Sequence, residues 1–169
     1  MANVLVVDDE AAISQLLECY LGACGYDVTA SRSSLGSLGW LDSASFDVVV
    51  LDVALNGAMN GIEVCRAVKS DYRMTSTAVL IISALPDIKS QALAAGADAF
   101  ISKPFRLDNL RELVDALAKE GPKNLPAQSG STVKAAIESY LFNPVRGTDI
   151  GLHSIGSPGF SDPPSHLVH

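Results

Sequence analysis

The sequence has few of the residues that build redox centres, and it has no long apolar segment. Its three cysteines, Cys19, Cys24 and Cys65, show no CxxC spacing and no neighbouring histidine, so we expect buried, reduced thiols without a metal or redox role. No apolar run approaches the roughly 18 residues that cross a bilayer. The first residues, MANVLVV, lack the basic and long apolar segments of a secretory signal. These absences predict a soluble, cytoplasmic protein without membrane insertion.

Positive charge is also in deficit. The chain carries 12 Lys and Arg against 19 Asp and Glu, which gives a formal net charge of -7. This balance opposes binding to the phosphate backbone of nucleic acid and favours cationic partners, either metal ions or basic protein surfaces. We therefore expect no direct nucleic-acid binding.

Short apolar runs alternate with longer helix-like patterns between residues 3 and 119, which is typical of βα units around a parallel sheet. The predicted strands cover residues 3–7, 26–30, 47–51, 78–83 and 99–102, and the predicted helices cover 11–21, 35–41, 62–70, 89–95 and 107–119. VVVL and AVLII are continuous apolar runs in the third and fourth strands, as expected for strands covered on both faces. We predict an α/β fold: a doubly wound, five-stranded parallel sheet with helices on both faces.

The composition changes after residue 119. Residues 120–130 hold two prolines and two glycines without apolar periodicity, which predicts a linker. Residues 131–142 place Val133, Ile137 and Tyr140 on one side of a predicted amphipathic helix, which either docks on the domain or a partner or stays half-formed. Residues 143–169, rich in Gly, Pro and Ser, predict a disordered tail. This C-terminal extension is too short for a winged-helix output domain and has no basic stripe.

Acidic residues follow two of the predicted strands. Asp8, Asp9 and Glu10 stand after the first strand, where a nucleotide-binding fold would have GxGxxG, and Asp52 follows the third. The carboxyl ends of parallel strands meet at one edge of the sheet, so the carboxylates of Asp8, Asp9 and Asp52 should converge there. Lys103, after the fifth strand, adds a positive charge at the same edge.

Converging carboxylates repel one another unless a cation balances them, and Mg²⁺, with its preference for oxygen ligands, is the natural candidate. A simpler interpretation needs no site. Asp8 and Asp9 would be helix N-caps, Asp52 a loop acid and Lys103 a surface residue. Each residue taken alone fits that simpler interpretation.

The combination of motifs resembles the response-regulator receiver domain. VVDDE follows the first strand, LD the third, IIS the fourth, and AGADAF leads into ISKPF at the fifth. The resemblance covers residues 3–119 in order. It implies that Asp52 accepts a phosphoryl group from a sensor histidine kinase or a histidine phosphotransfer protein. It also implies two-component signalling through an unidentified downstream protein, and it allows a homodimer.

The resemblance implies an Mg²⁺ site as well. Asp9, Asp52 and the backbone carbonyl of Ala54 would hold the ion, while Asp8 would act through a metal-bound water. Such an ion would neutralise the phosphoryl oxygens during in-line transfer to Asp52.

Four further residues take roles by the same resemblance. Lys103 would balance charge on the phosphoryl group, and the Ser83 hydroxyl would donate a hydrogen bond to it. Pro104 permits a cis peptide bond after Lys103. Phe100 would be the switch aromatic, which turns inward when phosphorylation draws Ser83 toward the site.

The loop VALNGAMNG departs from the family pattern. Asn56 stands where the family usually has proline, four residues past the aspartate, and Gly61 arrives one residue late. This longer loop removes no reactive group, but it can alter the Ala54 carbonyl or kinase docking. Ala54 and Leu85 occupy positions that tune hydrolysis in the family. Neither side chain can orient water, so we expect a slowly decaying phosphoryl group.

Three functions therefore stand as hypotheses. The first is a phosphoacceptor switch, which is not an enzyme although it assists its own phosphorylation and dephosphorylation. The second is a receiver-shaped adaptor that works without phosphorylation, favoured if the altered loop prevents transfer. The third is a Mg²⁺-dependent phosphohydrolase, which usually has a DxDxT-like motif. Here Asp52 is followed by Val-Ala-Leu.

Overall fold

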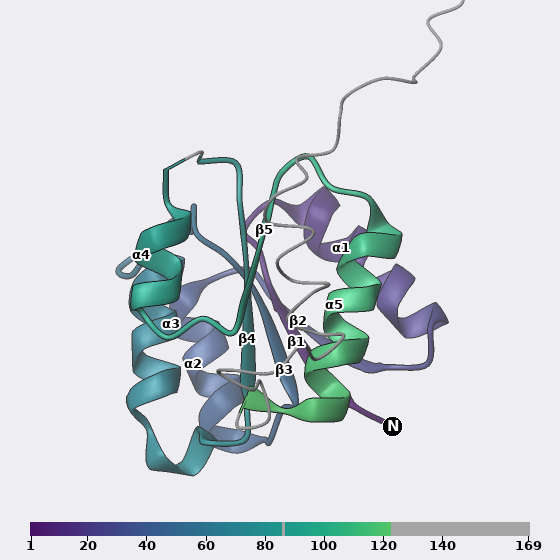
Figure 1. The fold of residues 1–169 in the computed structure, drawn as a ribbon, viewed down its shortest axis with the longest axis horizontal. Helices are drawn as coiled ribbons and strands as arrows, with labels where there is room; N and C mark the ends of the chain where they lie inside the picture. Colours follow the sequence, from purple (N-terminus) through teal and green to yellow (C-terminus); the bar gives the residue numbers. More distant parts are fainter. Residues whose placement is uncertain (86, 123–169) are drawn as a thin grey trace, which may run out of the picture.

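The computed structural model describes residues 1–85 and 87–122, and within them strands and helices alternate along the chain (Figure 1). The strands are β1 (Asn3–Val7), β2 (Asp27–Ser31), β3 (Val48–Asp52), β4 (Ala78–Ser83) and β5 (Ala99–Ser102). The helices are α1 (Ala11–Ala23), α2 (Ser34–Ser43), α3 (Gly61–Ser70), α4 (Lys89–Ala94) and α5 (Leu107–Glu120), with a short 3-10 turn η1 (Tyr72–Met74). Most of the predicted linker, the predicted helix at 131–142 and the predicted tail at 143–169 lie outside the described residues.

The five strands form one parallel sheet in the order β2-β1-β3-β4-β5. Helices α2, α3 and α4 cover one face of the sheet, and α1 and α5 cover the other (Figure 1). The chain reverses direction across the sheet between β2 and β3, so both faces are covered. This arrangement confirms the predicted doubly wound α/β fold.

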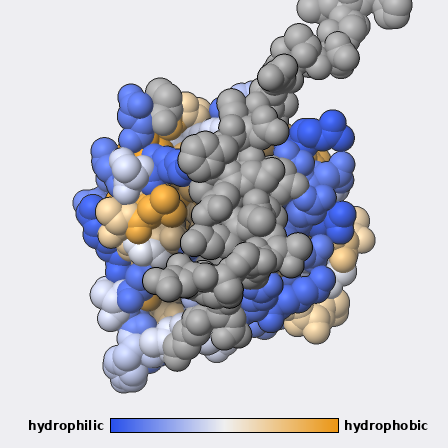
Figure 2. All heavy atoms as spheres, in the orientation of Figure 1, coloured by the Kyte–Doolittle hydropathy of each residue, from blue (hydrophilic) through white to orange (hydrophobic). Residues whose placement is uncertain are grey.

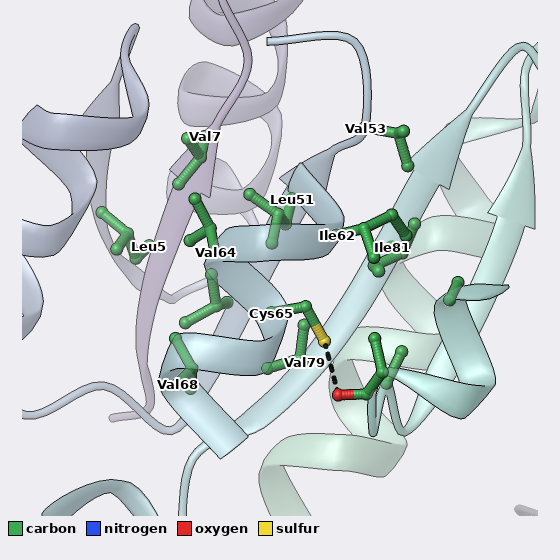
Figure 3. Packing of buried hydrophobic residues seen from close by; sticks show 14 of the residues in the cluster. Leu5, Val7, Leu51, Val53, Ile62, Val64, Cys65, Val68, Val79 and Ile81 are labelled. Carbon is green, nitrogen blue, oxygen red and sulfur yellow. Dashed lines mark hydrogen bonds between the residues drawn. The ribbon is translucent and has the colours of Figure 1, made fainter. Parts of the chain in front are cut away.

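The sheet separates two apolar cores because successive side chains of a strand point to opposite faces. In β3, Val49 and Leu51 belong to the core under α2, α3 and α4, whereas Val48 and Val50 belong to the core under α1 and α5. Figure 3 shows Leu51 in the first core among labelled residues of β1, α3 and β4. Burying one such Val or Leu side chain stabilises the fold by about 1.5–3 kcal/mol.

Helix α3 begins in a capping box that the local sequence specifies. The Asn60 side chain accepts a hydrogen bond from the Glu63 backbone N-H, and the Glu63 carboxylate accepts one from the Asn60 backbone N-H. Two backbone donors that the helix leaves unpaired are thereby satisfied. The loop that follows Asp52 ends where α3 begins, so this capping box also fixes the C-terminal end of that loop.

The cysteine prediction was wrong for two residues. Cys65 is buried in α3, where its thiol donates to the Ala95 carbonyl oxygen at 3.7 Å (Figure 3). Cys19 and Cys24, however, are exposed, because Cys19 lies on the outer side of α1 and Cys24 follows its end. All three are free thiols. Within residues 1–85 and 87–122, no helix combines the length and apolar character that a bilayer crossing requires.

Candidate functional site

Three carboxylates meet at the carboxyl edge of the sheet. Asp52 is the last residue of β3, and Asp8 and Asp9 follow β1, whose Val7 pairs with Leu51 of β3. One oxygen from each of Asp8, Asp9 and Asp52 lies within 4.8 Å of the other two. The parallel pairing of β1 with β3 therefore brings residues more than 40 positions apart into one cluster.

Lys103 completes this cluster from the end of β5. Its Nζ donates to Asp8 Oδ2 at 2.9 Å and lies 3.5 Å from Asp52 Oδ1. The Lys103 backbone N-H donates to the Ser83 carbonyl oxygen at 2.8 Å, which extends the β4–β5 pairing by one residue. The Lys103–Pro104 peptide bond is cis. The four charged residues singled out from the sequence thus share one site.

The site is largely shielded from solvent. Asp8 and Asp52 are 1% and 4% exposed, and the Lys103 side chain is 21% exposed. Burial raises the pKa of Asp52, and the negative charge of Asp8 raises it further, although Lys103 and the Ala54 backbone oppose the shift. Burial would lower the pKa of Lys103, but its hydrogen bonds and ion pairs with Asp8 and Asp52 raise it overall.

The donor set fits a magnesium ion. Mg²⁺ binds oxygen ligands at about 2.0–2.1 Å, so oxygens on opposite sides of the ion are about 4.2 Å apart. The carboxylate oxygens lie within 4.8 Å of one another, near enough for two of them to bind one such ion directly. If all three acids are ionised, Lys103 balances one of them, and the two remaining negative charges match a divalent cation.

The structure does not support the simpler interpretation of the acids as helix caps. The N-cap of α1 is Glu10, whose side chain makes no capping hydrogen bond. Asp8 instead accepts from the Glu10 backbone N-H at 2.9 Å and from Lys103, so it bridges its own loop and β5. Asp52 is buried and Lys103 is only partly exposed, unlike an ordinary loop acid and surface lysine.

Gly61 allows α3 to approach the backbone of Asp52. A Cβ at position 61 would lie 2.8 Å from the Asp52 carbonyl carbon and 2.9 Å from Val53 Cα, which is too close for any side chain. The Gly61 N-H donates to the Val53 carbonyl oxygen at 3.0 Å. The late glycine in VALNGAMNG therefore packs directly against the end of β3 despite the longer loop.

Asn56 is a site residue that the sequence patterns missed. Its backbone N-H donates to Asp9 Oδ2 at 3.2 Å, and its side-chain amide donates to the same oxygen. The sequence marks position 56 only as a departure from the family pattern. A contact between two loops 47 residues apart leaves no spacing signal that could have revealed it.

The other predicted residues lie around the charged cluster or behind it. Ser83 ends β4, is 1% exposed, and accepts a hydrogen bond from the Leu85 N-H at 3.0 Å. Ala54 and Leu85 are exposed. Phe100 pairs with Ile81 across β4 and β5 and is 5% exposed in the core under α3 and α4. Phe100 is therefore already inside, whereas we expected it to turn inward only on phosphorylation.

Two pockets differ in their relation to the site. An apolar groove of about 420 Å³ lies beside Lys103, between the start of α1 and the segment from Pro104 to the start of α5. Its lining includes Ile13, Leu16, Leu17, Phe105 and Leu107. A polar pocket of about 330 Å³ is lined by Asn3, Phe46 and Arg73 near the opposite ends of the strands, and it contains none of the clustered acids.

Comparisons of the sequence identify its relatives. Residues 4–115 match the model of the response regulator receiver domain. The chain is 33% identical over 125 residues to the response regulator ArlR of Staphylococcus haemolyticus, covering 73% of this chain and 55% of that protein. It is 31% identical over 121 residues to the DNA-binding dual master transcriptional regulator RpaA of Synechocystis, covering 70% and 50%. The chain thus spans about half the length of these relatives.

Solved structures show the same relationship. The receiver domain of the Francisella response regulator 1452 is 28% identical and superposes with a TM-score of 0.65, covering 70% of this chain and 98% of that one. The response regulator TrrA of Thermotoga maritima, solved in complex with Mg²⁺-BeF, is 30% identical with a TM-score of 0.63, covering 69% and 99%. Receiver domains are in general signalling switches. On its sequence and its fold, this chain belongs to the response-regulator receiver domain family of two-component signalling.

Proposed function

We propose that the chain is a phosphoacceptor switch in which Asp52 receives a phosphoryl group from a sensor histidine kinase or a histidine phosphotransfer protein. The observation that carries the proposal is the cluster itself. Asp52 is buried at a strand end, with Asp8 and Asp9 within 4.8 Å and the Lys103 ammonium 3.5 Å away. A carboxylate in such surroundings can attack phosphorus while fixed charges balance the incoming phosphoryl group.

Each residue of the cluster has a task in this transfer. An Asp52 oxygen forms a bond to phosphorus as the bond between phosphorus and the donor histidine nitrogen breaks. Lys103 then pairs with the new phosphoryl oxygens, which takes its Nζ from Asp8 and Asp52 toward the acyl phosphate. The Ser83 hydroxyl, which accepts from the Leu85 N-H, remains free to donate its own proton to a phosphoryl oxygen.

The same proposal assigns Mg²⁺ to the acids. Asp9, Asp52 and the Ala54 carbonyl would hold the ion, with Asp8 acting through a bound water. When bound, the ion supplies positive charge to the equatorial oxygens of the phosphoryl group. The geometry of the three carboxylates supports this assignment, as does the Mg²⁺-BeF complex of the related TrrA.

Partners would bind on two different surfaces. The apolar groove beside Lys103 lies next to the reacting carboxylate and suits the phosphodonor protein. The output surface would comprise α4, β5 and α5, where Leu93 of α4 is 41% exposed. Figure 2 shows a hydrophobic area at the level of α4. Homodimerisation through this surface belongs to the same proposal.

A cytoplasmic location is also part of the proposal. Cys19 and Cys24 are exposed free thiols, which suits a reducing compartment.

The adaptor hypothesis has one observation in its favour, because Asn56 of the altered loop donates two hydrogen bonds to Asp9, one of the expected metal ligands. Incubation of the full chain with Mg²⁺ and a small phosphodonor, followed by mass spectrometry, separates the functions. A stable gain of one phosphoryl group that Asp52→Asn abolishes supports the switch. An unchanged mass supports the adaptor, and multiple turnover of a small phosphoester would support a phosphohydrolase.

A further inference from the structure

The loop that joins β3 to α3 places the amide group of Asn56 against Asp9. Asp9 is the one acid of the cluster that has no oxygen within 4 Å of Lys103 Nζ. Lys103 pairs with Asp8 and Asp52. Asp9 instead receives the backbone N-H and the side-chain amide of Asn56, both on Oδ2. Each of the three carboxylates therefore has a donor from elsewhere in the chain, and the donor of Asp9 carries no net charge.

The neighbours of Asn56 hold it in this position. Val53 and Leu55 are buried in the core under α3, so they anchor the first part of the loop. Gly57 follows with a φ of 134°, a backbone conformation that favours glycine and turns the chain away directly after Asn56. The loop ends in the capping box of Asn60 and Glu63 at the start of α3. Asn56 thus lies in the exposed part of a loop that is fixed at both ends.

We propose that Asn56 is a positioning residue that competes with a divalent cation for Asp9, so that cation binding releases Asn56 and shifts the loop between Asp52 and α3. This inference rests on the proposed Mg²⁺ site and adds a means of regulating it. The loop conformation then reports whether the cation is bound.

The competition follows from electrostatics. A hydrogen-bonded N-H points the positive end of its dipole at the carboxylate oxygen. A cation bound to the Asp9 carboxylate is therefore repelled by the positive ends of both Asn56 N-H dipoles. Binding of the cation therefore weakens both hydrogen bonds or breaks them. Because the Asn56 amide is neutral and exposed, water replaces Asp9 as its partner at low cost. Displacing the charged Lys103 from Asp8 costs more.

Calorimetric titration of the unphosphorylated full chain with MgCl₂ tests the proposal. Asn56→Ala removes the side-chain donor and keeps the backbone N-H, so we expect Mg²⁺ to bind about three- to tenfold more tightly than in the unsubstituted chain. Asn3→Ala is the matched control. It also removes an asparagine amide that donates one hydrogen bond, here to the Ser45 carbonyl oxygen near the opposite edge of the sheet. Its Mg²⁺ affinity should not change.

A second readout needs no substitution. In ¹H–¹⁵N NMR spectra of the unsubstituted chain, the side-chain amide signals of Asn56 should move toward those of a solvent-exposed amide as Mg²⁺ is added. The amide signals of Gly57 and Ala58 should shift with the same midpoint. Asn56 signals that stay unchanged at saturating Mg²⁺ would overturn the proposal, even if Asn56→Ala failed to fold.

The outcomes also separate this proposal from the proposed function. If the unsubstituted chain binds Mg²⁺ and Asn56→Ala binds it equally well or more weakly, the competition is refuted while the metal site stands. Weaker binding would mean that Asn56 orients Asp9 for the cation. If no folded variant binds Mg²⁺, the competition and the metal site both fail. Tighter binding in Asn56→Ala alone supports the competition.

Discussion

The Lys103 ammonium lies 2.9 Å from an oxygen of Asp8 and 3.5 Å from an oxygen of Asp52. One lysine at the end of β5 thus joins two buried acids from the ends of β1 and β3, across β4 in the sheet order. Removing either acid leaves the other paired. Removing the lysine leaves both acids without an opposite charge, so it should have the larger effect on folding.

Lys103→Met should therefore destabilise the chain in the absence of Mg²⁺. Breaking a fully buried ion pair costs about 3–5 kcal/mol, and because the Lys103 side chain is 21% exposed we expect about 1–3 kcal/mol. Urea denaturation followed by circular dichroism measures the change. Saturating Mg²⁺ should restore part of the loss, since the cation would replace the missing positive charge. Stability equal to that of the unsubstituted chain without Mg²⁺ would contradict this account.

Gly61→Ala should destabilise the chain because the new Cβ meets the backbone of Asp52 and Val53, which has no room to move. We expect a loss of about 1–3 kcal/mol in the free energy of unfolding. Gly39→Ala provides a matched control, because position 39 lies in helix α2 with no atom within 4 Å of a new Cβ. There the alanine should be neutral or stabilise the chain by up to about 1 kcal/mol. Similar effects at the two sites would argue against close packing at Gly61.

Asp52 should lower stability progressively as it ionises. Burial raises its pKa in the folded chain above the ordinary value of 3.8. Its favourable contribution is therefore complete below the unfolded pKa and is lost as pH rises through the folded pKa. Asn cannot ionise, so Asp52→Asn does not lose this stability as the pH rises. Without Mg²⁺, the free energy of unfolding of the variant, relative to that of the unsubstituted chain, should therefore increase from acidic to neutral pH. Denaturation curves across that range test the sign, and Asp42→Asn on the surface is the control. A relative gain that shrinks toward neutral pH would contradict the prediction.

Thiol labelling should distinguish the cysteines. Cys19 and Cys24 are exposed and should react rapidly with a colorimetric disulfide reagent in the folded chain. Burial raises the pKa of Cys65 to about 11, so near neutral pH it is both inaccessible and almost fully protonated. It should react only after urea is added. Rapid native labelling of Cys65, detected by peptide mapping, would show that the packing of α3 opens readily.

The phosphoryl group on Asp52 should persist for minutes rather than seconds in the purified chain with Mg²⁺. Ala54 and Leu85 are exposed next to the site, and neither side chain can position water for attack on phosphorus. Ala54→Gln supplies an amide that can do so and should shorten the lifetime. Loss of radiolabel over time measures the phosphoryl lifetime in the unsubstituted chain and in Ala54→Gln. A label lost within seconds from the unsubstituted protein would refute the prediction.

Most of the sheet was predictable from the sequence. The strands at Asn3–Val7, Ala78–Ser83 and Ala99–Ser102 have the predicted bounds, and the remaining two are displaced by one residue. The apolar runs of a doubly covered parallel sheet are short and well separated, so their ends are easy to read. The charged cluster followed from the same logic, since parallel strands bring their carboxyl ends to one edge.

The missed features depend on contacts that no local pattern records. Asn56 meets Asp9 only because two loops fold over the same edge of the sheet. Cys19 and Cys24 are exposed although cysteine is usually buried, because each lies outside the side of α1 that packs on the sheet. The turn Tyr72–Met74 was also missed, since it is held by the Asp71 side chain and not by apolar periodicity.

The sheet also separates the interior into two apolar cores, one on each of its faces. Phe100 and Ala92 of α4 belong to one, and Leu110 of α5 belongs to the other. Both cores pack against the same strands, so a substitution that shifts a strand affects both, whereas a substitution in a helix acts first on its own core. A domain built in this way has two cores that can be altered one at a time, so a substitution at Leu110 should loosen α5 and leave the packing of α4 unchanged.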